Sequence, residues 1–462
     1  MIGTRTSLRA RSVAVVAAAV LLLSAVPAVA APGGDALIET STFIVAAGDS
    51  PAKSAVVMCP SGTRATGGGA APVDPEAQDF YRIQVSGPVD GTGAVINTDT
   101  GDVPRGWAVA VSHFLTSVDV RFKAFALCSR TSDVVVQAAP AQETDHYFGA
   151  PECPNSTRAV GGGAGSLTTI EDGVQAYVTL SSHPVDASGT AARTVNGDVA
   201  VAWSTRVLTN SGSPGAPRLF SLCSDESDAT VRARSFTLAP EEVGGADVAC
   251  PSGTRALAGG LVSAEEVQTS DRIEYSAPLD GTASLAGTRD GDIARRWLSA
   301  ARNATDVDRT FRVMALCGES EPRPDALIKR ATDSAYVGQN VYSPTPQVRR
   351  WSAVRGQTRS FNLVFENDGE DDTFTIRGCA TRRAASVMYI NPKTGANVTT
   401  KVTGPGYVTS LPHGARRSLV LRLKPTASAT IGSSIRCRVT VTSALDSGIV
   451  DAVIAEIRVI DG

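Results

Sequence analysis

The stretch Cys59–Arg64 has the sequence Cys-Pro-Ser-Gly-Thr-Arg, and near-copies of it begin at Cys153 and Cys250. A glycine-rich run follows each copy within a few residues. The copies lie about 95 residues apart, whereas one propeller blade or trefoil lobe needs only about 40 to 50 residues. Each period is therefore long enough to form a complete structural unit.

Further landmarks recur in the same order within each period. The glycines are followed by a Pro-x-Asp turn, a Gly-Asp pair, a tryptophan and a closing cysteine. The landmark residues are Asp90, Asp186 and Asp280; Asp102, Asp198 and Asp292; Trp107, Trp203 and Trp297; and Cys128, Cys223 and Cys317. This order indicates three copies of one unit.

The segments between the landmarks have the pattern of strands. Apolar and polar residues alternate in runs such as Val120–Leu127, and clusters of Gly, Asp, Ser and Pro separate the runs. The fold class expected is all-β, with three tandem disulfide-stapled β-sandwich-like repeats and a C-terminal Ig-like β-sandwich. Because hardly any linker separates the repeats, we expect them to pack rigidly in a row or to close around a pseudo-threefold axis.

The landmarks stop after Cys317, where the polar stretch Gly318–Pro324 indicates a domain boundary. Cleanly alternating strands follow, such as Ser418–Lys424 and Ile435–Thr442, with tight turns between them. The predicted divisions are a signal peptide at 1–30, repeats at 31–131, 132–228 and 229–321 (units 1, 2 and 3 below), and a sandwich at 322–462.

Eight cysteines follow the predicted signal peptide, an even number that indicates disulfides in an oxidising compartment. Repeat symmetry favours one bridge within each unit over the rival linkage of Cys128 to Cys153, which joins neighbouring units. No Cys-x-x-Cys arrangement or nearby histidine suggests zinc. The predicted pairs are Cys59 with Cys128, Cys153 with Cys223, Cys250 with Cys317, and Cys379 with Cys437.

The N-terminus has the pattern of a secretory signal peptide. Three arginines precede the apolar run Val13–Val26, and Ala28-Val29-Ala30 matches a small-x-small cleavage site. No later segment has the roughly 20 apolar residues of a membrane span. The formal charge is −3, with no long charged block. We therefore expect a secreted, extracellular protein with no membrane span and no nucleic-acid partner.

Two resemblances follow from these motifs. The Cys-Pro-x-x-Thr-Arg, Gly-rich, Trp, Cys units resemble tandem modules of secreted proteins from high-GC bacteria, for which no activity is known. The segment from Phe361 through Asn367-Asp368-Gly369 and Asp372-Thr373-Phe374 to Asp446 and Asp451 resembles Ig-like β-sandwich modules related to bacterial cell-adhesion domains. The second resemblance implies a sandwich fold and a role in adhesion.

No catalytic signature is present. The four histidines, His113, His146, His183 and His413, do not recur between units, and His183 stands where the other units have Gly87 and Ala277. The sequence has neither a Gly-x-Ser-x-Gly elbow nor a phosphate-binding loop. We expect no enzyme activity, no cofactor and no metal.

The recurring aromatic and acidic residues are the candidate ligand contacts. Trp107, Trp203 and Trp297 either fill the core, which is the usual fate of large aromatics and the one we predict, or stack on sugars from exposed positions. The Gly-Asp carboxylates, Asp102, Asp198 and Asp292, either lock turns by pairing with Arg64, Arg158 and Arg255 or, together with Asp90 and its equivalents, bind calcium. We expect each arginine to contact a carboxylate or carbonyls of its own unit.

The function expected is that of a secreted, non-catalytic binding or structural protein at the cell surface or in the extracellular matrix, with an unknown protein or glycan partner. One alternative is a multivalent carbohydrate-binding protein with three equivalent sites, where avidity strengthens weak binding. Another is a secreted enzyme whose site the sequence does not reveal.

Overall fold

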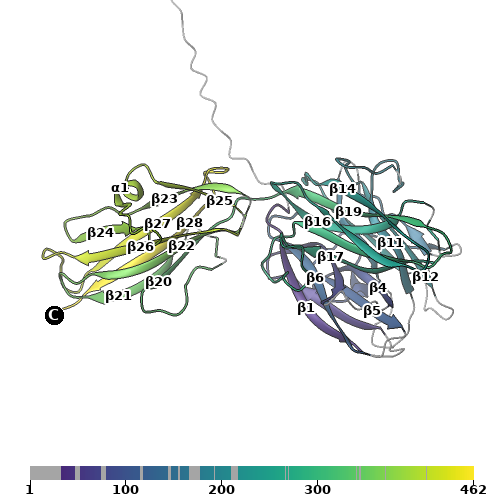
Figure 1. Ribbon diagram of the computed structural model, residues 1–462, viewed down its shortest axis with the longest axis horizontal. Helices are drawn as coiled ribbons and strands as arrows, with labels where there is room; N and C mark the ends of the chain where they lie inside the picture. The colour runs from purple at the N-terminus through teal and green to yellow at the C-terminus, as the bar shows by residue number, and fades with distance from the viewer. Residues whose placement is uncertain are drawn as a thin grey trace, which may run out of the picture.

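The structure is a computed structural model of the 462-residue chain. It describes residues 33–46, 52–73, 80–114, 118–143, 147–154, 157–165, 177–191, 193–209, 217–265, 267–268, 270–339, 341–342, 345–369, 371–412 and 414–462. Figure 1 shows two bodies, a three-unit body from the first part of the chain and a C-terminal sandwich.

The predicted all-β class is confirmed. Besides strands, the described residues form only a short α-helix, α1 (Thr399–Thr403), and one 3₁₀ turn, η1 (Val95–Asn97). Within this described part, no helix has the length and apolar character needed to cross a membrane.

Three sheets build the three-unit body, and each sheet combines strands of two units. The unit 1–3 sheet has the order β1 (Leu37–Val45), β6 (Val120–Ser129), β3 (Arg64–Pro72), β17 (Asp271–Leu279), β18 (Arg296–Asn303), β15 (Val243–Ala249). The unit 1–2 sheet has the order β2 (Lys53–Met58), β5 (Gly106–Phe114), β4 (Phe80–Val89), β10 (Arg158–Gly165), β13 (Arg218–Ser224), β7 (Val135–Pro140). The unit 2–3 sheet has the order β14 (Thr230–Leu238), β19 (Arg309–Glu319), β16 (Thr254–Ser263), β11 (Tyr177–Val185), β12 (Ala202–Thr209), β9 (Tyr147–Gly149), β8 (Gln142–Glu143).

The shared sheets link the three units into a closed ring. Unit 1 meets unit 2 where β4 pairs with β10, unit 2 meets unit 3 where β11 pairs with β16, and unit 3 returns to unit 1 where β17 pairs with β3. One serine marks each junction, with the register pairs Ser86 to Ala164, Ser182 to Leu261 and Ser276 to Ala70. Of the two arrangements that the sequence left open, the sheets therefore form the pseudo-threefold one.

The glycine runs are explained by close approach at these junctions. A Cβ at Gly69 would overlap the carbonyl oxygen of Ser276, and the equivalent Gly163 and Gly260 face the carbonyls of Ser86 and Ser182 in the same way. The preceding glycine of each run faces a tryptophan, since a Cβ there would overlap the indole. These second glycines are Gly68, Gly162 and Gly259, which face Trp107, Trp203 and Trp297 respectively.

The first position of each run lies where the three glycine-rich strands β3, β10 and β16 meet. This position is Gly67 in unit 1, Gly161 in unit 2 and Ala258 in unit 3. A Cβ at Gly161 would overlap the carbonyl oxygen of Thr66, and a Cβ at Gly67 would lie 2.7 Å from the Ala258 methyl. Only one of the three axial positions therefore has room for a methyl group, which explains why only one unit has alanine in place of glycine.

Backbone hydrogen bonds of the Gly-Asp pairs also join one unit to the next. Each aspartate carbonyl accepts an N–H from the first strand of the following unit, and the last of these bonds returns to unit 1. The bonds are Val136 N–H to Asp102 O, Val231 N–H to Asp198 O and Ile38 N–H to Asp292 O, each 2.9 Å.

All four predicted disulfides are present, so the rival linkage between units is wrong. The Cα–Cα distances are 5.5 Å for Cys59–Cys128 and Cys153–Cys223, 5.6 Å for Cys250–Cys317 and 5.3 Å for Cys379–Cys437. All four distances lie within the usual range of about 4.4 to 6.8 Å.

Two sheets facing one apolar core form the C-terminal sandwich. One sheet has the order β20 (Pro324–Arg330), β22 (Arg359–Asn367), β26 (Arg416–Pro425), β24 (Ala385–Ile390). The other has the order β21 (Gln347–Ala353), β28 (Val450–Val459), β27 (Ser434–Ser443), β23 (Asp372–Gly378), β25 (Tyr407–Leu411).

A short connection between β19 and β20 joins the two bodies and is tied to the start of the described chain. The Glu321 N–H donates to the Gly34 carbonyl at 2.7 Å, and the Arg323 guanidinium lies 3.6 Å from the Asp35 carboxylate. These contacts place the sandwich beside the point where the chain enters unit 1.

The axial packing predicts that a methyl group added at the axis lowers the melting temperature more than a methyl group added at an open position. Gly161→Ala should lower the melting temperature by several degrees, because overpacking against the Thr66 carbonyl costs about 1 to 3 kcal/mol. Gly91→Ala is the matched control, since a Cβ at Gly91 has no heavy atom within 4 Å. Equal melting temperatures for the two variants would contradict the close axial packing.

Candidate functional site

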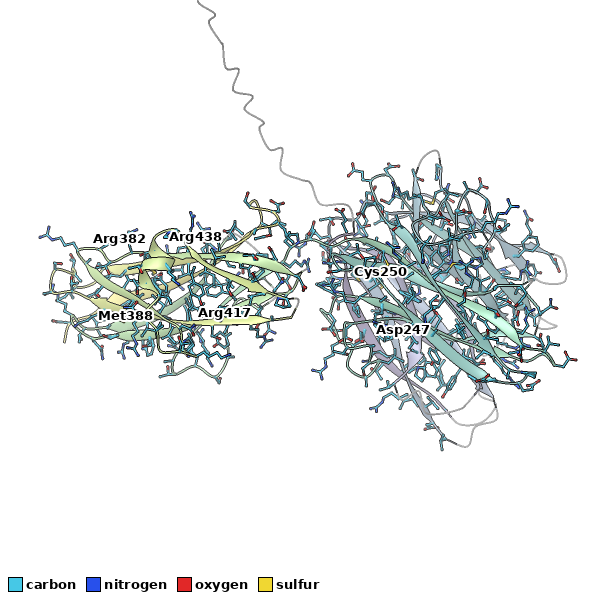
Figure 2. All side chains as sticks on the ribbon, turned by 45° about the horizontal axis from the view of Figure 1, so that its top comes forward. Asp247, Cys250, Arg382, Met388, Arg417 and Arg438 are labelled. Atoms are coloured by element: carbon cyan, nitrogen blue, oxygen red, sulfur yellow. A yellow bond between two sulfur atoms is a disulfide. The ribbon has the colours of Figure 1, made fainter. Side chains whose placement is uncertain are left out.

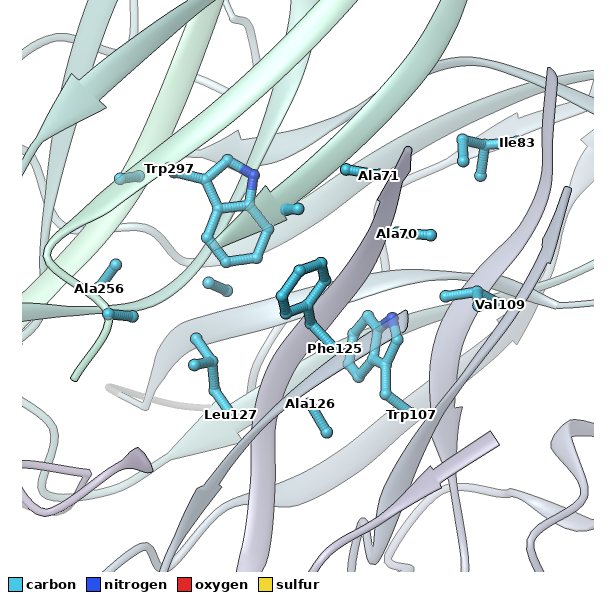
Figure 3. Close-up of a cluster of buried hydrophobic side chains, with 14 of the residues drawn as sticks. Ala70, Ala71, Ile83, Trp107, Val109, Phe125, Ala126, Leu127, Ala256 and Trp297 are labelled. Carbon is cyan, nitrogen blue, oxygen red and sulfur yellow. The ribbon is translucent and has the colours of Figure 1, made fainter. Parts of the chain in front are cut away.

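The three repeated tryptophans are buried, as predicted. Their exposed fractions are 1 % for Trp107, 1 % for Trp203 and 0 % for Trp297. Figure 3 shows Trp107 and Trp297 in one apolar cluster with Phe125 and Leu127. Because the indoles are enclosed, none of them presents a face on which a sugar can stack.

Each buried indole also has a hydrogen-bond partner at a junction between units. The indole N–H donates to a serine hydroxyl, as buried tryptophans usually require. The pairs are Trp107 to Ser86 at 3.0 Å, Trp203 to Ser182 at 2.8 Å and Trp297 to Ser276 at 2.8 Å. The tryptophans therefore link the core to the serines at which the units join.

The repeated aspartates bind backbone within their own loops. In each Gly-Asp pair the carboxylate accepts the N–H three residues earlier, at 2.7 Å for Asp102, 2.7 Å for Asp198 and 2.6 Å for Asp292. Asp90 likewise accepts the Thr92 N–H at 2.8 Å. These bonds support a turn-forming role and give no indication of a shared calcium site.

The predicted partners of the repeated arginines were partly wrong. Arg64 donates to the carbonyls of Asp133 and Val134 at 2.8 and 2.9 Å, and the buried Arg255 donates to the Ala36 carbonyl at 2.7 Å. All three acceptors belong to the following unit, so both arginines join neighbouring units. Arg255 also donates through Nε to the Ser320 hydroxyl of its own unit at 2.7 Å.

The remaining arginine differs from these two. Arg158 is half-buried, and the described part of the chain shows no corresponding bond for it.

Unit 2 departs from the other units on one face of its strands β11 and β12. Four polar residues there, Ser181, His183, Ser204 and Arg206, form two facing pairs, since Ser181 lies opposite Arg206 and His183 lies opposite Ser204. The equivalent residues are Val85, Gly87, Ala108 and Ala110 in unit 1 and Tyr275, Ala277, Leu298 and Ala300 in unit 3. Only unit 2 therefore has a polar face at this place.

This polar face lines a pocket of about 400 Å³. Loop residues 189–191, the end of β16 with the residue after it (262–264), Glu265 and Val267 form the other parts of its wall. The volume suits a small polar ligand, because ligand pockets usually measure about 300 to 1,000 Å³.

The pocket wall contains a buried histidine with an unsatisfied nitrogen. His183 is only 4 % exposed, and its Nδ1 has no hydrogen-bond partner. Burial, together with the positive charges of Arg206 and Arg312, lowers the pKa of His183 to about 3. The imidazole is therefore neutral at physiological pH, so Nδ1 can act as a hydrogen-bond donor or acceptor for a ligand.

Two guanidiniums make the surroundings of His183 positive. Arg206 donates to the Val267 carbonyl at 3.2 Å and lies over the Phe148 ring, while Arg312 donates to the carbonyls of Ala191 and Thr194 at 2.6 and 2.7 Å. Neither arginine is paired with a carboxylate in the part of the chain that is described. The pocket thus favours a ligand that carries negative charge or carbonyl-type acceptors.

The pocket lacks the geometry of a nucleophilic enzyme. A hydrolase of the serine type needs its nucleophile within hydrogen-bond distance of a histidine base. No described serine bonds to His183, and the lowered pKa makes this imidazole a weak base. The side chains of His113, His146 and His413 lie outside the described part of the chain.

An acidic cluster that the sequence did not suggest lies in the sandwich. Asp325, Glu366 and Asp368 bring carboxylate oxygens within 4.8 Å of one another. Arg416 pairs with Glu366 at 2.9 Å, and the Tyr342 hydroxyl donates to Asp368 at 3.0 Å. Because partners of the protein itself already contact two of these carboxylates, we assign no metal here.

Comparisons with known proteins do not identify a family. No protein-family model matches the sequence, and no curated protein matches it.

Burial of the three tryptophans predicts the accessibility of the intrinsic fluorescence. After Trp351→Phe, iodide should quench little of the remaining emission, because Trp107, Trp203 and Trp297 are enclosed. The same variant unfolded in guanidinium chloride provides the fully quenched control. Strong quenching of the folded variant would show that at least one indole is exposed.

The buried histidine predicts a difference in pH dependence. The pKa of His183 is about 3 in the folded protein, against an ordinary value of 6.5 for the unfolded chain, so the unfolded chain binds the extra proton as the pH falls between these values. The neutral, buried imidazole therefore contributes fully to folding stability above pH 6.5, and this contribution is lost as the pH falls. Between pH 7 and pH 5, the melting temperature of His183→Ala should therefore fall less than the melting temperature of the wild type. Parallel pH profiles would contradict a buried neutral imidazole.

Proposed function

We propose that this chain is a secreted, non-catalytic binding protein that acts at the cell surface or in the extracellular matrix. The single observation that carries the proposal is the polar pocket of unit 2, where His183 and Arg206 replace small residues of the other two units. The pattern of the N-terminus and the four disulfides support an extracellular location.

The pocket supports a binding role more strongly than a catalytic one. Its lining combines the neutral imidazole of His183, the guanidinium of Arg206 and serine hydroxyls, which together can orient a small polar ligand. The three equivalent tryptophans cannot serve as multivalent sugar-binding sites, because their indoles are buried. A single ligand site in unit 2 is the proposal that remains.

A glycan array, supplemented with immobilised small carboxylic acids, tests this proposal. The double variant His183→Gly/Arg206→Ala restores the residues of unit 1, and we expect it to lose at least tenfold in affinity for any ligand that the wild type binds. Arg234→Ala is the control, because Arg234 is an exposed arginine away from the pocket. Ligand recovered from the wild type should be chemically unchanged.

Three results would contradict the proposal. One is the absence of any ligand on the array, and another is equal binding by the wild type and the double variant. The third is conversion of the bound ligand to product, which would favour the enzyme alternative.

A further inference from the structure

The two bodies of the chain carry opposite formal charges. Residues 322–462 contain 19 Lys and Arg against 11 Asp and Glu, a formal charge of +8, whereas the whole chain has −3. Figure 2 labels three of these basic residues, Arg382, Arg417 and Arg438, on the sandwich. Charge asymmetry between parts of one chain indicates an interaction with charged partners.

Part of this positive charge lines a groove of about 500 Å³ at the β21 edge of the sandwich. Strands β21, β28 and β27 lie side by side there, with Arg350 and Arg436 both opposite Glu456, and with Arg458 between Ser352 and Ser434. The groove therefore presents guanidiniums and serine hydroxyls on adjacent strands.

Two further arginines reach the groove from the facing sheet and pack against Trp351. The Arg359 guanidinium lies 4.8 Å from the centre of the Trp351 ring, and that of Arg330 lies 6.0 Å away. Arg359 also donates through Nε to the Ser352 carbonyl at 2.8 Å. Packing on the indole holds these side chains in place, so less conformational entropy is lost when they bind an anion.

The acidic residues at the groove do not neutralise its arginines. Asp333 is shared by Arg330 and Arg349, each at 2.7 Å, and Glu456 is shared by Arg350 and Arg436 at 3.6 and 3.1 Å. Arg359 and Arg458 add two more positive charges. The groove lining itself contains four arginines, Arg330, Arg350, Arg359 and Arg458, and one carboxylate, Glu456, so its local charge stays positive.

We propose that this arginine groove binds an acidic polysaccharide through its carboxylate groups. Guanidinium matches carboxylate geometry with two parallel hydrogen bonds, and the groove volume suits one or two sugar rings. Ser352 and Ser434 add hydroxyl groups to the groove lining.

Nucleic acid fits the groove less well. Single-stranded nucleic acids bind largely by stacking bases on aromatic rings, whereas Trp351 already packs against Arg359 and Arg330 and meets Phe361 edge-on. The site is independent of the unit 2 pocket, so each proposal can fail without the other.

Binding of the full chain to polygalacturonate, measured at low and at moderate salt, tests the inference. We expect measurable affinity that weakens as salt rises, because the contacts are charge pairs on the surface. Arg350→Gln/Arg458→Gln should weaken binding at least tenfold. Arg382→Gln/Arg383→Gln removes the same charge from an exposed turn outside the groove and should change binding less than twofold.

Several outcomes would overturn the inference. Equal losses of affinity for the two double variants would show that only the overall charge of the sandwich matters. Absence of binding at low salt would exclude the site. Tighter binding of single-stranded poly-dT than of polygalacturonate, lost with Arg350→Gln/Arg458→Gln, would assign the groove to nucleic acid. Melting temperatures equal to that of the wild type confirm that both variants are folded, and the double variant of the unit 2 pocket should bind polygalacturonate normally.

Discussion

The close approach of three glycine-rich strands at one axis is the constraint on which the three-unit body depends. Backbone atoms of β3, β10 and β16 come so near one another that two of the three axial positions have no room for a methyl group. Sheets built this way must be shared between units, because the glycines of one unit pack on the backbone of another. A unit separated from its neighbours would leave these strand edges unpaired, which is unfavourable for any sheet.

The same constraint separates structural from functional residues. Residues that recur in all three units mostly serve ring closure: the glycines at the junctions, the indoles that bond to Ser86, Ser182 and Ser276, and the aspartates that hold turns. Function is more reasonably sought where one unit differs from the other two. His183 and Arg206 are such differences, and they line the same pocket.

Much of the fold could be predicted from the sequence. The cysteine spacing and repeat symmetry gave the disulfide pairs, and the scarcity of aromatics favoured burial of the tryptophans. Sheet sharing could not be deduced, because alternating apolar and polar residues indicate strands without indicating which strand lies beside them. For the same reason Arg64 and Arg255 were assigned to their own units, although both contact the following one.

The candidate sites were less predictable than the fold. The pocket joins segments from units 2 and 3, yet one signal for it was present, since aligning the three units shows Arg206 opposite Ala110 and Ala300. The charge of the sandwich was equally visible once each body was counted separately. The groove itself depends on how Arg330 and Arg359 pack on Trp351, which no periodicity reveals.

Differential scanning calorimetry tests the closed ring most directly. If the three units form one body, they should unfold together in a single transition, with a calorimetric enthalpy close to the van't Hoff enthalpy, beside at most one further transition for the sandwich. Resolution of the three-unit body into separate transitions, one for each unit, would contradict the account.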